Sequence, residues 1–599
     1  MNKSSPYWIA WFVFSLISAA VAMLYTSASI VDGQYIPVGN DSFYHARRII
    51  DAAIGVRGFY QFDTMIHVPE GSWLNWPWAY DWLMALALRV ALWIRPEMQP
   101  MKFLAYMPVF WVFVNAGLMT LVARQVQLNV AATAVALLAF SLLPLTQNLH
   151  GLGLIDHHFI ELTFILLTVF CGLRYFEQQR AKDAAVLGAV LGVAVAIHNG
   201  LFILQIPVLA AVFLLWIEAQ TPPRQSLYWL AATLFATTLL VALPSAPLHD
   251  LQFEFWTLSW FHVYVAFGSA VALTFFALRP CSKVNIGILA AIGVAMLVPM
   301  FARVVTGAAF LSGELDIIKN ISEVQSPISR MLRPGGVAWV SSLYGWLIFV
   351  APILLVLHGF ELFMRRKPEA VYLSVIILFG IAMLLSQYRL HPFGAWAIII
   401  GGLLAIERLR QRVGASTLLA TAATLAVLAV ALQPPLRNQL FVRAPPGLDR
   451  DYAATRSLYP ALSRACGSSP GIVLALADDG HPVRYHTDCS VIVNNFLMTP
   501  LHAQKLREVD AYLNMTPQEL VRDTDIQYLF VRLDEVFFSG PEGVQPTSID
   551  VVKQYNSPLF FQLAFAKNIP SHYRLLAEVR VEDDRDFAFG RVFEIVRAE

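Results

Sequence analysis

Short polar motifs in the sequence contain residue types that could bind a cation. Asp41 lies in VGNDSFYHARR, and Asp156 and His158 lie in GLGLIDHHFIEL. Asp156 and His158 stand two residues apart at the mouth of an apolar segment, so both side chains can point at one cation if the backbone turns there. Oxygen-rich ligands with one imidazole suit Mn²⁺ or Mg²⁺. A lone D-x-H pair is a weak signal, since charges beside apolar segments are commonly just solvated.

Two further motifs each contain a charged residue outside the apolar segments. Glu323 lies in ISEVQSP, and Arg389 lies in QYRLHPFG. A carboxylate can polarise or deprotonate a poor nucleophile. A guanidinium binds phosphate through two parallel, charge-assisted hydrogen bonds, which lysine cannot reproduce. The other interpretation of Arg389 is an anchor that holds the end of a membrane span among lipid headgroups.

These motifs lie between long apolar segments. The chain of 599 residues is 57% hydrophobic and 14% charged, with a formal net charge of +1. Soluble proteins carry about a quarter charged residues, so the composition predicts a membrane protein, and no basic field indicates nucleic-acid binding. About 13 segments approach the length that crosses about 30 Å of hydrocarbon. They are 8–30, 99–121, 127–147, 157–174, 184–198, 200–217, 226–244, 257–278, 284–302, 337–357, 370–386, 392–406 and 416–432.

The connections between these segments alternate in charge. Every second connection is basic, and basic loops stay in the cytoplasm. With an odd number of spans and a cytoplasmic N-terminus, the chain ends outside. We therefore expect a multi-pass protein of the cell inner membrane, with the polar motifs and the C-terminal region on the periplasmic or extracytoplasmic side. The basic residues are Arg124, Arg174, Arg180, Lys182, Arg224, Arg279, Lys283, Arg365, Arg366, Lys367, Arg408, Arg410 and Arg412.

The hydropathy pattern divides the chain into three parts. Residues 1–432 form the predicted membrane domain, with long outer loops at about 31–98 and 303–336. Residues 433–450 are a predicted linker. Residues 451–599 alternate β-rich runs such as GIVLALA with helical ones such as TPLHAQKLREVDAYL, which predicts a small α/β domain outside the membrane. Cys466 and Cys489 lie in that domain and are expected to form a disulfide, or else two buried free thiols.

Taken in order, the motifs resemble those of the oligosaccharyltransferase catalytic subunit family, especially its single-subunit bacterial and archaeal members. VGNDSFYHARR looks like the first acidic motif of that family, and GLGLIDHHFIEL looks like the second, in its archaeal D-x-H form. ISEVQSP resembles the loop motif that ends in glutamate, and QYRLHPFG resembles the segment with a phosphate-binding arginine. The resemblance implies a GT-C-type glycosyltransferase fold, with about 13 transmembrane helices and an outer soluble domain.

One motif departs from the family. A tryptophan-tryptophan-aspartate motif recognises the hydroxyl residue of the Asn-x-Ser/Thr acceptor in that family, and the matching place here is LADDG. Leu476 and Ala477 stand where the family has two tryptophans, whereas Asp478 remains as the implied acceptor-binding residue. A pocket without two aromatic walls can bind a different acceptor.

The resemblance implies a metal-dependent transfer of a glycan from a polyprenyl-diphosphate donor to a protein acceptor. Asp41, Asp156 and His158 would hold Mn²⁺ or Mg²⁺, Asp41 and Glu323 would act in catalysis, and Arg389 would bind the donor phosphate. A cation and an arginine can together neutralise a departing diphosphate.

Two alternatives to this function stay open. One keeps the donor chemistry but uses a lipid or glycan acceptor. The other is a lipid-linked glycan transporter, which would carry ionisable groups near the middle of its spans. The middle of the predicted spans carries almost no charge, which argues against transport.

Overall fold

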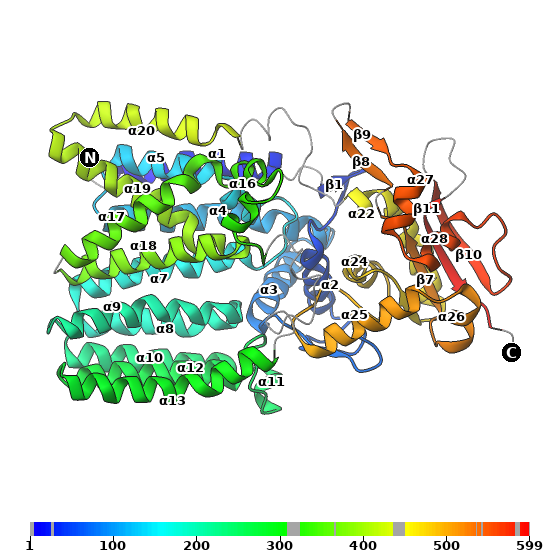
Figure 1. The fold of residues 1–599 in the computed structure, drawn as a ribbon, viewed down its shortest axis with the longest axis horizontal. Coiled ribbons are helices and arrows are strands. Elements are labelled where there is room, and N and C mark those ends of the chain that lie inside the picture. The colour runs from blue at the N-terminus through cyan, green and yellow to red at the C-terminus, as the bar shows by residue number, and fades with distance from the viewer. Residues whose placement is uncertain are drawn as a thin grey trace. The chain divides into compact units, whose positions relative to one another are not determined.

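The computed structural model of the chain describes residues 5–25, 29–307, 324–364, 367–434, 450–534, 536–540, 543–580 and 588–597. The chain divides into two compact units (Figure 1). The first unit comprises Met1–Ile36, Trp76–Thr306 and Leu315–Pro446. The second comprises Pro37–Asn75, Gly307–Glu314 and Gly447–Glu599.

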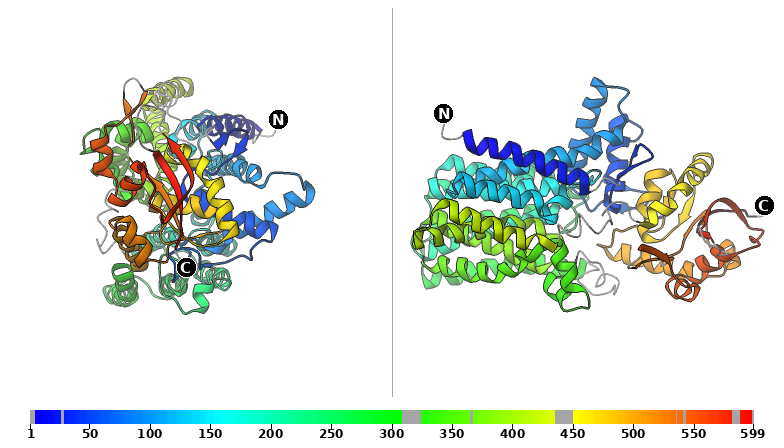
Figure 2. Two further views of the ribbon diagram at one scale, coloured as in Figure 1. Left: turned by 90° about the vertical axis from the view of Figure 1, so that its right-hand side faces the viewer. Right: turned by 90° about the horizontal axis from the view of Figure 1, so that it is seen from above.

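The first unit is a bundle of long helices that run side by side (Figure 2). Among the described residues, ten helices or helix series are long and apolar enough to cross a membrane, which makes this a multi-pass membrane fold. They are α1 (Ser5–Tyr25), α4 (Pro100–Gln125), α7 (His158–Gln178), η2 (Asn199–Leu204) with α9 (Gln205–Ile217), α10 (Arg224–Ala242), α12 (Trp260–Leu278), α13 (Lys283–Gly307), α16 (Gly336–Tyr344) with η5 (Gly345–Val350) and α17 (Ala351–Met364), α18 (Pro368–Ser386), and η6 (Tyr388–Leu390) with α19 (His391–Val413).

The other three predicted spans are helical but shorter. α5 (Val130–Leu142) and α6 (Pro144–His150) form one pair that is bent by 65°. Pro144 explains the bend, because the residue before a proline avoids helical backbone angles. Leu143, which precedes Pro144, accordingly has an extended backbone with ψ 122°. α8 (Ala181–Ile197) has 17 residues and α20 (Thr417–Ala431) has 15. The prediction of a polytopic helical fold is confirmed, with ten to eleven full-length spans among the described residues instead of 13.

Close helix packing in the first unit depends on small residues. A Cβ on Gly192 of α8 would lie 1.9 Å from Thr237 Oγ1 of α10, and one on Gly172 of α7 would lie 2.2 Å from the Tyr372 ring of α18. Tyr372 also donates a hydrogen bond to Thr168 O at 2.9 Å. Membrane helices lack a hydrophobic driving force for association, so such close contacts hold the bundle together.

Residues 31–98, the first predicted outer connection, contain regular secondary structure. They contain α2 (Asn40–Ile54), α3 (Trp78–Ile94) and two short hairpins, β1 (Ile30–Val31) with β2 (Gln34–Tyr35) and β3 (Phe62–Asp63) with β4 (Ser72–Trp73). In α2, buried Phe43, Ala46, Ile49 and Ala53 recur every three or four residues, which is the period of a helix that buries one face. Gly55, at φ 79, ends the helix.

The second unit is built on a five-stranded sheet, so the predicted α/β domain is confirmed. The strand order is β10 (Tyr573–Arg580), β11 (Ala588–Ile595), β7 (Tyr528–Arg532), β5 (Ile472–Leu474) and β6 (Ser490–Val491). β5 pairs in parallel with β6 and β7, and β11 pairs antiparallel with β7 and β10. All five residues of β7 are buried, as expected for a central strand.

Short helices and one hairpin complete the described structure. In the second unit they are α22 (Arg450–Thr455), η7 (Arg456–Leu458), α23 (Tyr459–Ser468), α24 (Ala477–His486), α25 (Pro500–Leu513), α26 (Pro517–Asp523), β8 (Phe537–Gly540) with β9 (Gly543–Pro546), α27 (Ile549–Tyr555) and α28 (Pro558–Phe565). The first unit adds α11 (Ala246–His249) and α15 (Pro327–Met331).

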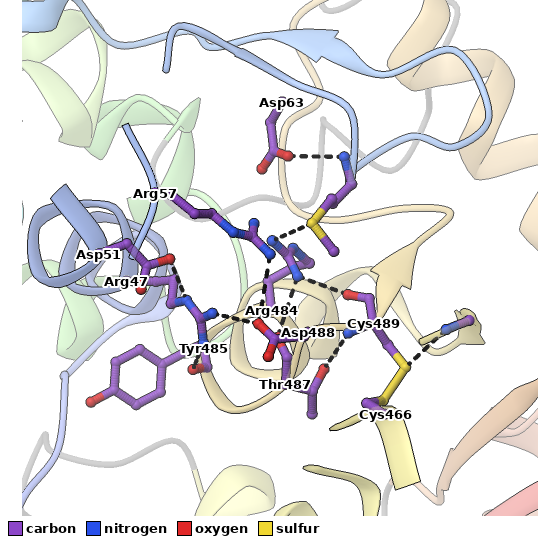
Figure 3. Close-up of polar contacts among 12 residues, drawn as sticks. Arg47, Asp51, Arg57, Asp63, Cys466, Arg484, Tyr485, Thr487, Asp488 and Cys489 are labelled. Atoms are coloured by element: carbon purple, nitrogen blue, oxygen red, sulfur yellow. Dashed lines mark hydrogen bonds and ion pairs between the residues drawn. A yellow bond between two sulfur atoms is a disulfide. The ribbon is translucent and has the colours of Figure 1, made fainter. Parts of the chain in front are cut away.

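The predicted disulfide between Cys466 and Cys489 is present, with the Cα atoms 5.4 Å apart (Figure 3). It joins the end of α23 to the residue before β6. The neighbouring chain segment 65–68 lies along β6, where Val491 N–H donates to Met65 O at 2.9 Å. Part of the first predicted outer loop therefore belongs to the sheet of the second unit.

Candidate active site

Asp156 ends the turn before α7, and its carboxylate contacts the next two side chains. Oδ1 accepts the backbone N–H of His157 at 2.7 Å and lies 2.6 Å from His157 Nδ1. Oδ2 lies 3.2 Å from His158 Nε2. The structure thus brings Asp156 and His158 together at one end of α7, in the arrangement that the D-x-H spacing allows.

Glu161, one helical turn further along α7, contacts three imidazoles. Its Oε2 lies 2.7 Å from His158 Nδ1. Its Oε1 lies 3.3 Å from His157 Nε2 and 2.5 Å from Nδ1 of His198, which follows α8. His157 and His198 also stack, with ring centroids 4.6 Å apart. Two carboxylates and three imidazoles therefore form one connected cluster.

The sequence analysis missed His157, Glu161 and His198 as site residues. The spacing could have found Glu161, because residues three and four apart on a helix share a face, and it lies at those distances from the two histidines. No local pattern marks His198, which comes from a different helix.

The cluster is buried on one side and opens on the other. The side chains of His157 and Glu161 are 1% and 4% exposed, whereas those of Asp156 and His158 are 16% and 25% exposed. Burial by itself would raise the pKa of Asp156, but the facing imidazoles of His158 and His157 outweigh it and hold that pKa well below its usual range. A carboxylate that stays charged beside an imidazole is a suitable donor set for Mn²⁺ or Mg²⁺.

Arg389 lies in η6, directly before α19, and is half-buried. Its charge acts on His198, so it belongs to the same region of the first unit as the cluster. The segment is fixed by Tyr388, whose hydroxyl accepts a hydrogen bond from Asn148 Nδ2 at 3.0 Å and whose ring stacks on His391.

The segment that follows Glu323 is hydrogen-bonded to the residues directly before Arg389. Gln325 O accepts the Tyr388 N–H at 3.0 Å, and Ser326 Oγ donates to Leu385 O at 3.0 Å. Two motifs that lie about 60 residues apart in the sequence are thus joined through their backbones. Glu323 itself lies outside the described residues.

Asp41 lies in the second unit, in the first turn of α2. Its Oδ1 is 3.9 Å from Nε2 of His481 in α24. The Tyr44 ring packs edge-on against His481. The Tyr44 hydroxyl donates a hydrogen bond to Asp63 Oδ2 at 2.6 Å. Asp41 therefore belongs to one unit, and Asp156 and His158 belong to the other.

The LADDG segment begins α24. Asp478 is exposed in the first turn, and Leu476 and Ala477 are half-buried. The next carboxylate, Asp479, is buried and pairs with Arg532 Nε at 3.0 Å. The next residue is Gly480, and a larger residue would not fit there, because its Cβ would lie 2.4 Å from Val493 O. Leu476 and Ala477 thus stand shortly before a buried ion pair in the sequence.

No family model matches the sequence, and no curated protein is similar to it at a significant level. Solved structures do match. The apo form of the Archaeoglobus fulgidus oligosaccharyltransferase superposes with a TM-score of 0.72 at 16% identity, over 96% of this chain and 79% of that chain.

Two further structures of this archaeal enzyme give the same result. The form tethered to an acceptor peptide with the NVT sequon has a TM-score of 0.71 at 17% identity, over 96% of this chain and 80% of that chain. The form with an inhibitory peptide and a dolichol-phosphate has a TM-score of 0.68 at 15% identity, over 96% and 79%. The resemblance to oligosaccharyltransferases is therefore confirmed at the level of the fold.

Proposed function

We propose that this protein is a metal-dependent, oligosaccharyltransferase-like glycosyltransferase that moves a glycan from a polyprenyl diphosphate to an acceptor on the extracytoplasmic side of the inner membrane. The observation that carries the proposal is the Asp156–His158 pair at the mouth of α7, in a chain that has the fold of the archaeal enzyme over almost its whole length. The alternation of basic loops supports the orientation.

Asp156 and His158 fit a divalent cation, and Asp41 is the further ligand that the motif pattern predicts. Mn²⁺ or Mg²⁺ would neutralise charge that develops on the departing diphosphate. Arg389, which lies in the same region of the first unit as this pair, would bind two oxygens of the donor phosphate. A half-buried guanidinium is well suited to this role, because its charge is screened less than that of a fully exposed one.

The acceptor side depends on Glu323, Asp41 and Asp478. Carboxylates can polarise an acceptor amide or hydroxyl and take its proton. The archaeal structure with a tethered NVT peptide motivates a polypeptide acceptor. Leu476 and Ala477 motivate the second candidate, a lipid or glycan acceptor, because they remove the aromatic walls that would hold the hydroxyl residue of a sequon.

The test uses the purified full-length protein in detergent with a labelled polyprenyl-diphosphate glycan. A peptide with an Asn-x-Thr sequon, a lipid acceptor and a free glycan are supplied in separate reactions, each with Mn²⁺ or with EDTA. We expect transfer to one acceptor class in Mn²⁺ only. Full transfer in EDTA would exclude the metal role, and failure to consume the donor with every acceptor would exclude a glycosyltransferase of this kind.

A further inference from the structure

His158 uses both of its ring nitrogens, one toward each carboxylate of the cluster. Nδ1 lies 2.7 Å from Glu161 Oε2, and Nε2 lies 3.2 Å from Asp156 Oδ2. An ionised carboxylate only accepts hydrogen bonds, so the short contact to Glu161 requires a proton on Nδ1. A cation bound between Nε2 and Asp156 would take the place of a proton on Nε2, because an imidazole binds a metal through a ring nitrogen that carries no proton.

Glu161 is itself held in place. Its other oxygen, Oε1, lies 2.5 Å from His198 Nδ1 and 3.3 Å from His157 Nε2, and its side chain is 4% exposed. It therefore cannot turn away from His158 without leaving two imidazole contacts. The carboxylate is fixed by α7 on one side and by the end of α8 on the other.

We propose that Glu161 is a positioning residue for the cation site. By accepting the Nδ1–H of His158, it fixes the tautomer and the ring orientation that present Nε2 toward Asp156. A histidine that binds a metal commonly donates its other N–H to a carboxylate, and loss of that carboxylate costs about 10–100-fold in metal affinity. The inference rests on the proposed cation site at Asp156 and His158.

The experiment measures Mn²⁺ affinity directly, by the electron paramagnetic resonance signal of free Mn²⁺, on the purified full-length protein without donor. We expect Glu161→Ala to weaken Mn²⁺ binding by about 10–100-fold. Glu161→Gln keeps an oxygen that can accept the Nδ1–H but loses the charge, so its affinity should fall between those of wild type and Glu161→Ala. The matched control is Glu177→Gln on the same helix, since Glu177 is exposed and contacts Gln125.

A second readout separates positioning from a structural role. In glycan transfer, Glu161→Ala should need about 10–100-fold more Mn²⁺ for half-maximal rate and approach the wild-type rate at saturating Mn²⁺. A variant that only destabilised the bundle would lose rate at every Mn²⁺ concentration. If Glu161→Ala does not fold, the Mn²⁺ affinity of Glu161→Gln decides the question.

Wild-type Mn²⁺ affinity in Glu161→Ala, or in Glu161→Gln where the alanine variant does not fold, would overturn the inference. Absence of Mn²⁺ binding by the wild type would overturn both the inference and the proposed cation site. If the wild type binds Mn²⁺ and the Glu161 variants bind it more weakly while no glycan is transferred, the role of Glu161 stands and only the proposed reaction is wrong.

Discussion

Arg47 and Asp488 form an ion pair at 2.6 Å although 441 residues separate them in the chain. Arg47 also pairs with Asp51 at 2.7 Å and donates to Tyr485 O at 3.3 Å, and Arg57 lies 3.6 Å from Asp488 (Figure 3). These contacts fix α2, which carries the predicted cation ligand Asp41, to the end of α24. Residue 41 is thus held by the C-terminal part of the chain.

Arg47→Ala should loosen α2 within the second unit. We expect the free energy of unfolding of this unit to fall by about 1–2 kcal/mol, because Arg47 pairs with Asp51, whose side chain is only 6% exposed. The pair with Asp488 contributes little, because that side chain is 57% exposed. Faster hydrogen exchange in peptides that cover residues 40–57 would show it. Arg522→Ala is the control, since it removes an ion pair with Asp523 whose two side chains are 74% and 41% exposed. Equal exchange in both variants would contradict the anchoring role.

Asp156→Ala and His158→Ala should each reduce glycan transfer by more than a factor of about 100, since each removes a proposed cation ligand and such losses exceed those of supporting residues. Wild type inactivated by EDTA should recover when Mn²⁺ is added, and neither variant should. Membrane insertion and detergent extraction should stay normal, because both side chains lie at the end of a helix. Transfer at more than a tenth of the wild-type rate in either variant would argue against a direct cation ligand.

Arg389→Lys should strongly reduce turnover of the lipid-linked donor although the charge is kept, because lysine cannot form two parallel hydrogen bonds to phosphate. An arginine that only anchored the span in the headgroup region would tolerate lysine. Donor-dependent rates measured across donor concentrations distinguish the two. Arg333→Lys serves as the control, because Arg333 belongs to the same unit and its side chain is exposed. Wild-type turnover in Arg389→Lys would exclude the phosphate role.

Acid should destabilise the second unit. Burial lowers the pKa of His481 and His486 to about 3, and burial together with the Lys505 charge lowers that of His67 to about 3. Unfolded histidine titrates near pH 6.5, so between about pH 6.5 and 3 the unfolded state binds more protons and stability falls as the pH falls. Hydrogen-exchange protection of peptides that cover 472–532, corrected for the intrinsic rate, should decline over this range.

His67 offers a variant for the same experiment. Its ring is fully buried and stacks on His502 at 4.3 Å, and its two nitrogens form no hydrogen bond among the residues that the structure describes. His67→Phe keeps the stacking and removes one titrating group, so the stability of the second unit should fall less steeply as the pH falls. Exposed His572 gives the control variant His572→Phe. An unchanged pH dependence in His67→Phe would show that His67 has the same pKa in the folded and unfolded states.

The sequence by itself determined the elements whose signal is local. Apolar segments of about 20 residues predicted the membrane helices, because a lipid environment requires every backbone polar group to be bonded within the helix. Alternating β-rich and helical runs predicted the α/β sheet of the second unit, which the structure contains. Cys466 and Cys489 were expected to pair from their shared compartment, and they do. The D-x-H pair was visible in the sequence for the same reason, since a single residue separates Asp156 from His158.

Only the tertiary structure decided which distant residues meet. It added Glu161 and His198 to the Asp156–His158 pair, joined Gln325 to Tyr388, and placed α2 against α24. No periodicity along the chain encodes such contacts, because they depend on how helices pack against one another. A buried carboxylate such as Glu161 must find partners wherever the neighbouring helices supply them, and here α8, which begins 20 residues after Glu161, supplies His198 at its far end.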